Sequence, residues 1–147
     1  MVTIEKHLLK LHDKIENFKS EKLSFKVDQL TSNSSLYCLE VLITNKESNS
    51  EKFACTLFFD CNKKIIYLDD YNTIFGSQKQ ISKNTLELFK QSLTIIKDIL
   101  TDHPSLDFKT IQTTTRIPDK FDLLKNIGFK QMEQLNHYGN TKFVLEL

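Results

Sequence analysis

The stretch that decides the fold lies near the carboxyl end of the chain, where the sequence reads Phe121-Asp122-Leu123-Leu124-Lys125-Asn126-Ile127-Gly128-Phe129. Just before it, Pro118 opens a short helix, because proline suits the first helical position. Glycine occurs only three times in 147 residues, so the Gly128-Phe129 pair at the helix end predicts a positive φ at the glycine. A strand over 129–135 follows at once, and a strand over 141–147 completes a hairpin.

Apolar periodicity predicts two further helices upstream. The stronger one spans 82–101, where apolar residues recur every three or four positions: Leu86, Phe89, Leu93, Ile96 and Leu100. The other is an amphipathic helix over 3–22, with an apolar stripe made of Ile4, Leu8, Leu11, Ile15 and Phe18. We expect this first helix to pack on the sheet of its own domain, because about two and a half heptads are few for a coiled coil.

Segments rich in β-branched and aromatic residues predict strands between and after these helices. They are expected at 23–30, 36–44, 52–59, 65–68 and 108–114, with polar turns at 31–35, 45–50 and 60–63. The strand, helix and strand that run from Ile65 to Ile111 require a parallel pair joined by a right-handed crossover. The fold class is therefore α+β (α/β in looser usage): a mixed, mostly antiparallel central sheet flanked by helices, in a single domain over 1–147.

Composition limits the kinds of protein that this chain encodes. Its 147 residues suit one domain, and 39% hydrophobic with 27% charged residues is ordinary for a globular protein. A net charge of +1, with nineteen lysines against the single Arg116, gives no reason to expect nucleic acid. No apolar run approaches the ~20 residues of a membrane span. Three cysteines without metal-ligand spacing predict reduced thiols, a cytoplasmic location and no metal site.

The order of elements over residues 23–147, ending on Gly128-Phe129 and a hairpin, resembles the GNAT superfamily of acyl-CoA N-acyltransferases. The resemblance implies that the strand before the long helix splays from its neighbour. Acetyl-CoA or another acyl-CoA then lies in the gap, bonded to strand backbone, and the corresponding contacts here fall on Leu68 and Asp70. The pyrophosphate is expected on the N-terminus of the following helix.

The phosphate loop of that family has the pattern Gln/Arg-x-x-Gly-x-Gly/Ala, and this chain departs from it. Its counterpart reads Gln78-Lys79-Gln80-Ile81-Ser82-Lys83, in which Ile81 and Lys83 replace the small residues that let backbone approach phosphate. We expect cofactor contacts from Gln78, Lys79, Ser82 and Lys83. The alternative is a solvated helix start capped by Ser82.

The catalytic residues implied by the resemblance are partly missing. The Tyr hydroxyl that returns a proton to the departing CoA thiolate corresponds here to Leu124, which has no proton to donate. The candidate general base is Asp69, at the end of the cofactor strand, or Glu40, within the strand at 36–44. Charges that solvate a strand end or an open sheet face account for the same two carboxylates.

The sequence supports two functional hypotheses. The first is an acyl-CoA-dependent N-acetyltransferase acting on a small-molecule or protein amine. The second is a catalytically inactive GNAT-fold interaction or regulatory protein, whose partner surface is the N-terminal helix or the edge of the final hairpin. Either version allows a homodimer, and neither nucleic acid nor a membrane is expected as a partner. A different α+β fold, of the cystatin type, would lack the crossover around 82–101 and remains a third alternative.

Overall fold

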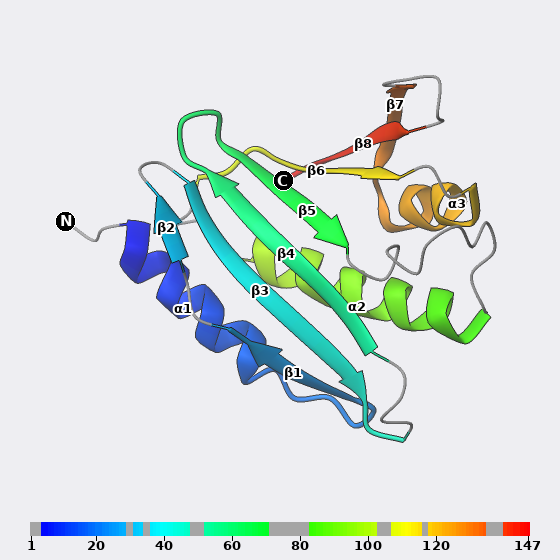
Figure 1. The fold of residues 1–147 in the computed structure, drawn as a ribbon, viewed down its shortest axis with the longest axis horizontal. Helices are drawn as coiled ribbons and strands as arrows, with labels where there is room; N and C mark the ends of the chain where they lie inside the picture. The colour runs from blue at the N-terminus through cyan, green and yellow to red at the C-terminus, as the bar shows by residue number, and fades with distance from the viewer. Residues whose placement is uncertain are drawn as a thin grey trace.

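The computed structural model describes residues 4–28, 31–33, 36–47, 52–70, 83–102, 107–115, 118–134 and 140–147. In chain order, the elements are α1 (Ile4–Glu16), β1 (Leu23–Val27), β2 (Thr31–Asn33), β3 (Leu36–Asn45), β4 (Lys52–Asp60), β5 (Ile65–Asp70), α2 (Lys83–Thr101), β6 (Thr110–Thr115), α3 (Pro118–Ile127), β7 (Lys130–Gln134) and β8 (Thr141–Glu146). Figure 1 labels them along the ribbon. None of the described helices is long and apolar enough to cross a membrane.

The eight described strands form one sheet in the order β1-β3-β4-β5-β6-β8-β7, with β2 also paired to β3. Neighbouring strands are antiparallel, except that β5 and β6 are parallel. The connection between β5 and β6 contains α2, so the predicted crossover is present. This strand order confirms the mixed, mostly antiparallel α+β sheet and excludes the alternative fold without a crossover.

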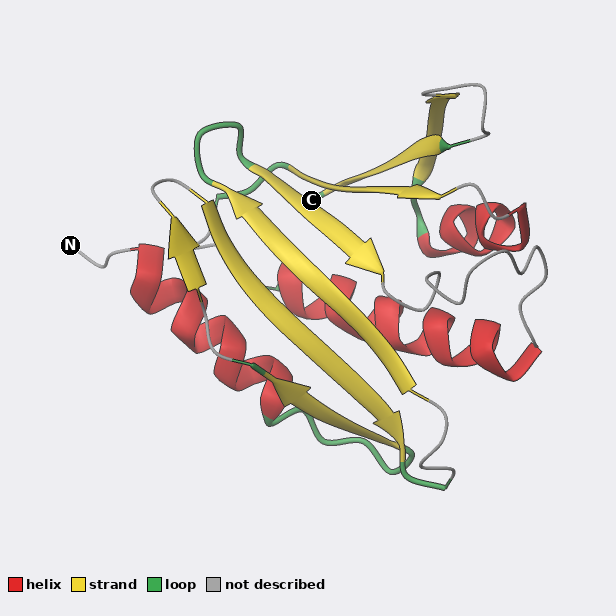
Figure 2. Cartoon of the chain, viewed as in Figure 1, coloured by secondary structure: helices red, strands yellow, loops and turns green. Residues whose placement is uncertain are grey.

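One hydrophobic core lies between the sheet and the helices. Leu8 and Leu11 of α1 are fully buried in it, together with Leu93 of α2. The rings of Phe53 on β4 and Phe89 on α2 meet edge to face, with 5.3 Å between their centroids. Figures 1 and 2 look onto the other face of the sheet, with α2 passing behind β4. The helical stripes expected from the sequence therefore point into the core.

The first helix is shorter than the predicted 3–22 and ends at Glu16. Past its end, the Ser20 hydroxyl accepts a hydrogen bond of 3.1 Å from the N–H of the first residue of β1, which turns the chain into that strand. Phe18 leaves the helical stripe and packs edge to face on Phe25 of β1, with ring centroids 5.3 Å apart. The predicted stripe is confirmed for its buried residues within α1. Its last residue, Phe18, lies after the end of the helix and packs from there.

The predicted turn over 31–35 is wrong in part, because its first three residues form the short strand β2. Its register against β3 starts at Thr31 opposite Cys38. Pairing with a long neighbouring strand outweighs the local turn preference of Ser and Asn. Smaller shifts occur at β1, which ends at Val27, and at β6, which begins at Thr110 rather than at residue 108.

Helix α3 ends in a Schellman motif at the Gly128-Phe129 pair. The N–H of Phe129 donates to the Leu124 carbonyl at 2.9 Å, and the N–H of Gly128 donates to the Lys125 carbonyl at 3.0 Å. Gly128 has a φ of 121°, which confirms the predicted positive φ, and a Cβ there would lie 3.2 Å from Leu145 Cδ1. Phe129 and Leu124, at the two ends of this motif, are both buried.

Candidate functional site

Strands β5 and β6 separate part-way along their length, and this divergence creates the candidate site. They pair in parallel over three residues, the last pair being Tyr67 and Gln112. Beyond that pair, β5 stays bonded to β4 as far as Asp70, while β6 stays bonded to β8 as far as Thr115. Figure 1 shows the two strands spreading apart toward their carboxyl ends. The splay that the resemblance implied is therefore present.

One side chain bridges the diverging strands. The hydroxyl of Thr113 on β6 donates a buried hydrogen bond of 3.0 Å to the carbonyl oxygen of Leu68 on β5. The Leu68 carbonyl therefore points toward β6. Because the direction of backbone groups alternates along a strand, the N–H and C=O of Asp70 point to the same side.

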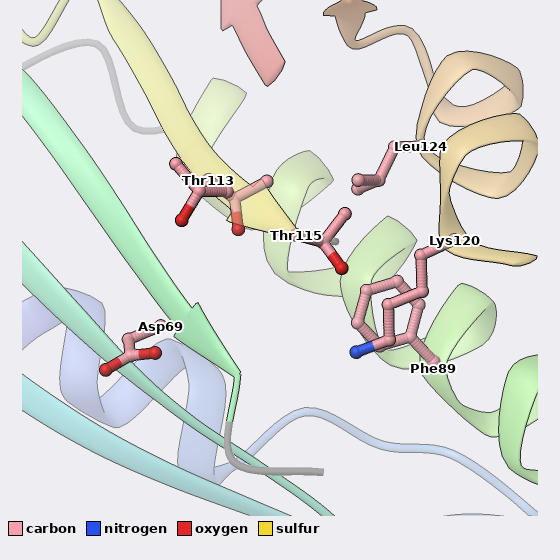
Figure 3. Close-up of a pocket in the computed structure, with 7 residues that line it drawn as sticks. Asp69, Phe89, Thr113, Thr115, Lys120 and Leu124 are labelled. Carbon is pink, nitrogen blue, oxygen red and sulfur yellow. The ribbon is translucent and has the colours of Figure 1, made fainter. Parts of the chain in front are cut away.

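A pocket opens where the strands diverge (Figure 3). The three consecutive threonines 113–115 of β6 line it, together with Asp69 of β5, Phe89 of α2, and Lys120 and Leu124 of α3. The empty space in and around it, with open solvent included, is about 280 Å³. Hydroxyls, a carboxylate and an amine share this space with an aromatic ring and a leucine. The pocket therefore offers both polar and apolar contacts to a ligand.

Lys120 is 2% exposed, which is rare for lysine because removing an ammonium group from water is costly. Its Nζ lies 4.5 Å from the centroid of the Phe89 ring, and this cation–π contact offsets part of the cost. Figure 3 shows the side chain running from α3 across the ring. A buried basic group therefore lies at the wall of the pocket.

Helix α3 presents Lys120 and Leu124 to the pocket together, since residues four apart share one helix face. The Nζ of Lys97 on α2 donates a hydrogen bond of 3.2 Å to the carbonyl oxygen of Ile127, at the end of α3. This bond satisfies a terminal carbonyl and places a cation at the negative end of the helix dipole. It also ties α3 to α2, the two helices that bound the pocket.

The two predicted bases lie on the same face of the sheet, two strands apart. Glu40 on β3 is opposite Thr56 on β4, and Thr56 is opposite Asp69 on β5. Opposed residues of antiparallel strands share a face, so the two exposed carboxylates flank Thr56 with their Cα atoms about 10 Å apart. Of the two, Asp69 lines the pocket, and Glu40 lies on the open face away from it.

The backbone of β5 determines where the two predicted cofactor contacts on this strand, Leu68 and Asp70, lie. Leu68 is buried, and its carbonyl accepts the hydrogen bond from Thr113. Asp70 pairs with Cys55 of β4 as the last residue of the strand. The side chain of Asp70 lies outside the described part of the structure, as do the predicted phosphate-loop residues Gln78, Lys79 and Ser82.

Lys83, the last residue of the predicted phosphate loop, is described. It is the first residue of α2 and is exposed. The helix that the resemblance placed after the loop therefore begins within one residue of the expected start. The contacts of the loop itself stay a prediction.

Sequence reasoning missed Lys120 and Thr113 as members of the site. A signal for Lys120 was available, because it lies four residues before Leu124 and so shares the buried face of a short helix. The signal for Thr113 was the run of threonines 113–115. A strand in the interior of a sheet is mostly apolar, so hydroxyls on such a strand indicate side-chain hydrogen bonds.

Among the described residues, no group of three or more His, Cys, Asp or Glu side chains is arranged to hold a metal ion. Cys38, Cys55 and Cys61 form no disulfide bond. Burial raises the pKa of the Cys61 thiol. A raised pKa lowers the thiolate fraction at neutral pH, so Cys61 is a poor candidate for a nucleophile.

The strand order, the divergence of β5 from β6 and the helix end at Gly128 are the structural features that the resemblance implied. The fold is the mixed α+β sheet with a crossover that the sequence predicted. No protein-family model and no curated protein sequence matches the chain.

Several solved structures have a similar arrangement. An acetyltransferase from Bacillus subtilis, in complex with CoA, is 12% identical, with 86% of this chain and 99% of that chain covered and a TM-score of 0.49. An acetyltransferase from Streptococcus agalactiae is 12% identical over 87% of this chain and 100% of that one, with a TM-score of 0.47. Spermidine N-acetyltransferase from Vibrio cholerae is 12% identical over 78% and 67%, with a TM-score of 0.43. At such identities and TM-scores, neither cofactor nor substrate follows for this chain.

Proposed function

We propose that this chain binds an acyl-CoA between the diverging ends of β5 and β6 and transfers the acyl group to an amine. The observation that carries the proposal is the divergence itself, because β5 remains held by β4 to Asp70 after its last pair with β6 at Tyr67. A strand end held on one side offers backbone groups on the other side to an extended amide chain. The pantetheine arm of acyl-CoA is such a chain.

Backbone direction supports this placement of the pantetheine arm. The Leu68 carbonyl points to the β6 side and retains a second lone pair beside the hydrogen bond from Thr113. The backbone groups of Asp70 share that direction. Two amides of an extended ligand therefore find acceptors and donors at the spacing of a β-strand.

The phosphates of the acyl-CoA are assigned to the start of α2. The first turn of a helix carries unpaired N–H groups and the positive end of the helix dipole. The first turn of α2, residues 83–86, contains no acidic residue that would repel an anion, and its Lys83 is exposed. Gln78, Lys79 and Ser82 complete the proposed phosphate contacts.

Asp69 is the proposed general base, since it combines exposure with a place in the lining of the pocket. The proton of the amine passes through a water molecule to the carboxylate. The nitrogen lone pair then attacks the thioester carbonyl, and a C–N bond forms. The C–S bond breaks with its electron pair leaving on sulfur, and the second proton of the attacking nitrogen passes to solvent water. A proton delivered to that sulfur completes the transfer.

Calorimetric titration of the protein with acetyl-CoA tests the binding step. We expect saturable binding that desulfo-CoA or free CoA competes for. The absence of binding at millimolar acetyl-CoA would end the proposal of an acyl-CoA-dependent enzyme.

Two matched carboxylate variants test the base. Asp69→Asn removes the carboxylate that lines the pocket, and we expect it to lower kcat by about 100-fold or more with an amine acceptor, while acetyl-CoA still binds. Glu40→Gln makes the same chemical change in the same cross-strand row, away from the pocket, and we expect no comparable loss. The reverse order of the two effects would move the assignment of the base to Glu40.

A catalytically inactive interaction protein is the second candidate function, and the burial of Leu124 at the position of the usual acid favours it. The surface for a second copy or another protein would be the strand β7, which lies at the end of the sheet order and carries the exposed Met132. This candidate predicts no affinity for acetyl-CoA together with a stable homodimer or complex in light scattering. A cytoplasmic location is part of both candidates and is tested by fractionation.

A further inference from the structure

The proposed transfer reaction lacks an assigned donor for the last proton, the one that the leaving thiolate needs. Leu124 fills the position where the resemblance places a tyrosine acid, and it is 1% exposed with no polar hydrogen. A CoA thiolate that leaves without a proton carries its full charge into a partly apolar pocket, which raises the barrier. The pocket therefore needs another donor.

Lys120 lies one helical turn before Leu124 on the same face of α3. The two Cα atoms are separated by about 6 Å along the helix axis. The Lys120 side chain is directed toward the Phe89 ring rather than toward Leu124 (Figure 3). Both side chains line the pocket at the end of β6, and Lys120 is the one basic residue among the described residues that line it. Its ammonium group carries three N–H donors and no acceptor.

The surroundings of Lys120 suit a group that is held as a cation. The Phe89 ring, 4.5 Å from Nζ, presents its negative face to the ammonium. The other titratable residue of the described lining is Asp69, which Figure 3 shows on the opposite side of the pocket, and the remaining polar lining groups are the neutral hydroxyls of residues 113–115. The base and the cation are therefore separated across the space that a reacting thioester would occupy.

We propose that Lys120 is the proton donor to the leaving thiolate, in place of the missing tyrosine; this assignment rests on the function proposed above. As the tetrahedral intermediate collapses, the C–S bond breaks and its electron pair moves onto sulfur. An N–H bond of the Lys120 ammonium breaks, its proton forms the S–H bond of free CoA, and the neutral amine regains a proton from water. Before the proton moves, the positive charge stabilises the charge that develops on sulfur.

Steady-state kinetics with acetyl-CoA and an amine acceptor test the assignment, using Lys120→Met, Lys120→Arg and Lys125→Met. Lys120→Met keeps about the same side-chain length and an apolar stem, and it removes the ammonium group with its protons. We expect unchanged acetyl-CoA affinity in calorimetry and a fall in kcat of about 100-fold or more. Lys120→Arg keeps a charge that does not give up its proton, so we expect it to bind acetyl-CoA and turn over slowly as well. Lys125, exposed on the same helix, supplies the control, and its variant should match the wild type.

The pH dependence of kcat separates a chemical role from a structural one. In the wild type, kcat should fall at high pH as the donor loses its proton, and this alkaline limb should be absent in Lys120→Met. Circular dichroism of each variant checks that it is folded, and Lys120→Gln replaces any variant that is not.

Each outcome decides the matter. A wild type that binds and transfers, with a Lys120→Met variant of equal kcat, overturns the role of Lys120 and leaves the proposed function intact. A wild type without acetyl-CoA binding or transfer overturns both. An acetylated Lys120 peptide in mass spectrometry after turnover also overturns the proposal, because an amide nitrogen cannot serve as the proton donor.

Discussion

The hydroxyl of Thr113 donates a 3.0 Å hydrogen bond to the carbonyl of Leu68, across two strands that have just ceased to pair. The last ladder pair, Tyr67 with Gln112, comes immediately before it. The bond thus marks the point where the sheet opens, and it satisfies a buried carbonyl that has no strand partner further along.

Replacing Thr113 by valine should lower the free energy of unfolding by about 1–3 kcal/mol, because the side chain keeps its volume while a buried carbonyl loses its donor. Urea denaturation measures the change. Thr114→Val, at the next and exposed position of β6, makes the same substitution and should stay within about 0.5 kcal/mol of the wild type. Equal costs at the two positions would show that the bond contributes no net stability.

Gly128→Ala should destabilise the protein by about 1–3 kcal/mol. The φ of 121° is unfavourable for any residue with a Cβ, and that Cβ would lie 3.2 Å from Leu145 Cδ1. Chemical denaturation gives the value. Asn126→Ala, an exposed change two residues earlier in the same helix, is the control and should be neutral or slightly stabilising. A neutral Gly128→Ala would mean that the helix end relaxes out of the Schellman geometry.

Lys97→Met should cost about 1 kcal/mol, because the Ile127 carbonyl at the end of α3 loses a charged donor at 3.2 Å. The contact of Lys97 with Asp98, at 3.8 Å, is exposed on the carboxylate side and adds little. Lys90→Met, on the exposed face of the same helix, provides the comparison. If both variants unfold at the same urea concentration, the tie between α2 and α3 is not stabilising.

The Cys61 thiol should react slowly with iodoacetamide at mildly alkaline pH. Burial raises its pKa, the positive charge of Lys64 lowers it by a smaller amount, and the carboxylate of Asp60 raises it. The thiolate fraction in the folded protein is therefore smaller than in the unfolded chain. The rate of modification, followed on the Cys61 peptide by mass spectrometry, should increase when the protein is unfolded in urea.

The raised pKa of Cys61 also determines the direction in which the stability of the folded protein changes with pH. Because the folded pKa lies above the unfolded one, the contribution of Cys61 is fully present below the unfolded pKa and is lost as pH rises through the folded pKa. Lys64→Gln removes the opposing charge and should slow the modification further. A faster reaction in that variant would contradict the assigned direction of the Lys64 effect.

Local pattern was sufficient for most of the fold. The stripe that begins at Leu86 predicted α2 to within one residue at its start, and Gly128 predicted the positive φ that ends α3. Both are short-range effects, in which spacing or backbone freedom determines the outcome. The same reasoning failed at Thr31, where pairing with β3 overrides a turn preference.

The candidate site was less predictable, because it is made of contacts between distant segments. Asp69 was named as a carboxylate at the end of the cofactor strand and Glu40 as one within the strand at 36–44. Their common row through Thr56 depends on the register of three strands. Lys120 resembles a surface lysine in the sequence. Its burial against Phe89 depends on how α3 packs on α2.

The sequence by itself determined the left-handed turn at Gly128 and the order of helices and strands apart from β2, since these depend on neighbours a few residues away. The crossover through α2 followed from that order. Tertiary structure alone decided where β5 and β6 part, which carbonyl Thr113 satisfies and which basic group enters the pocket. The physical reason is that a buried hydrogen bond or a buried ammonium depends on groups more than thirty residues away, as Thr113 and Leu68 are. Those groups meet only once the sheet and its helices have packed.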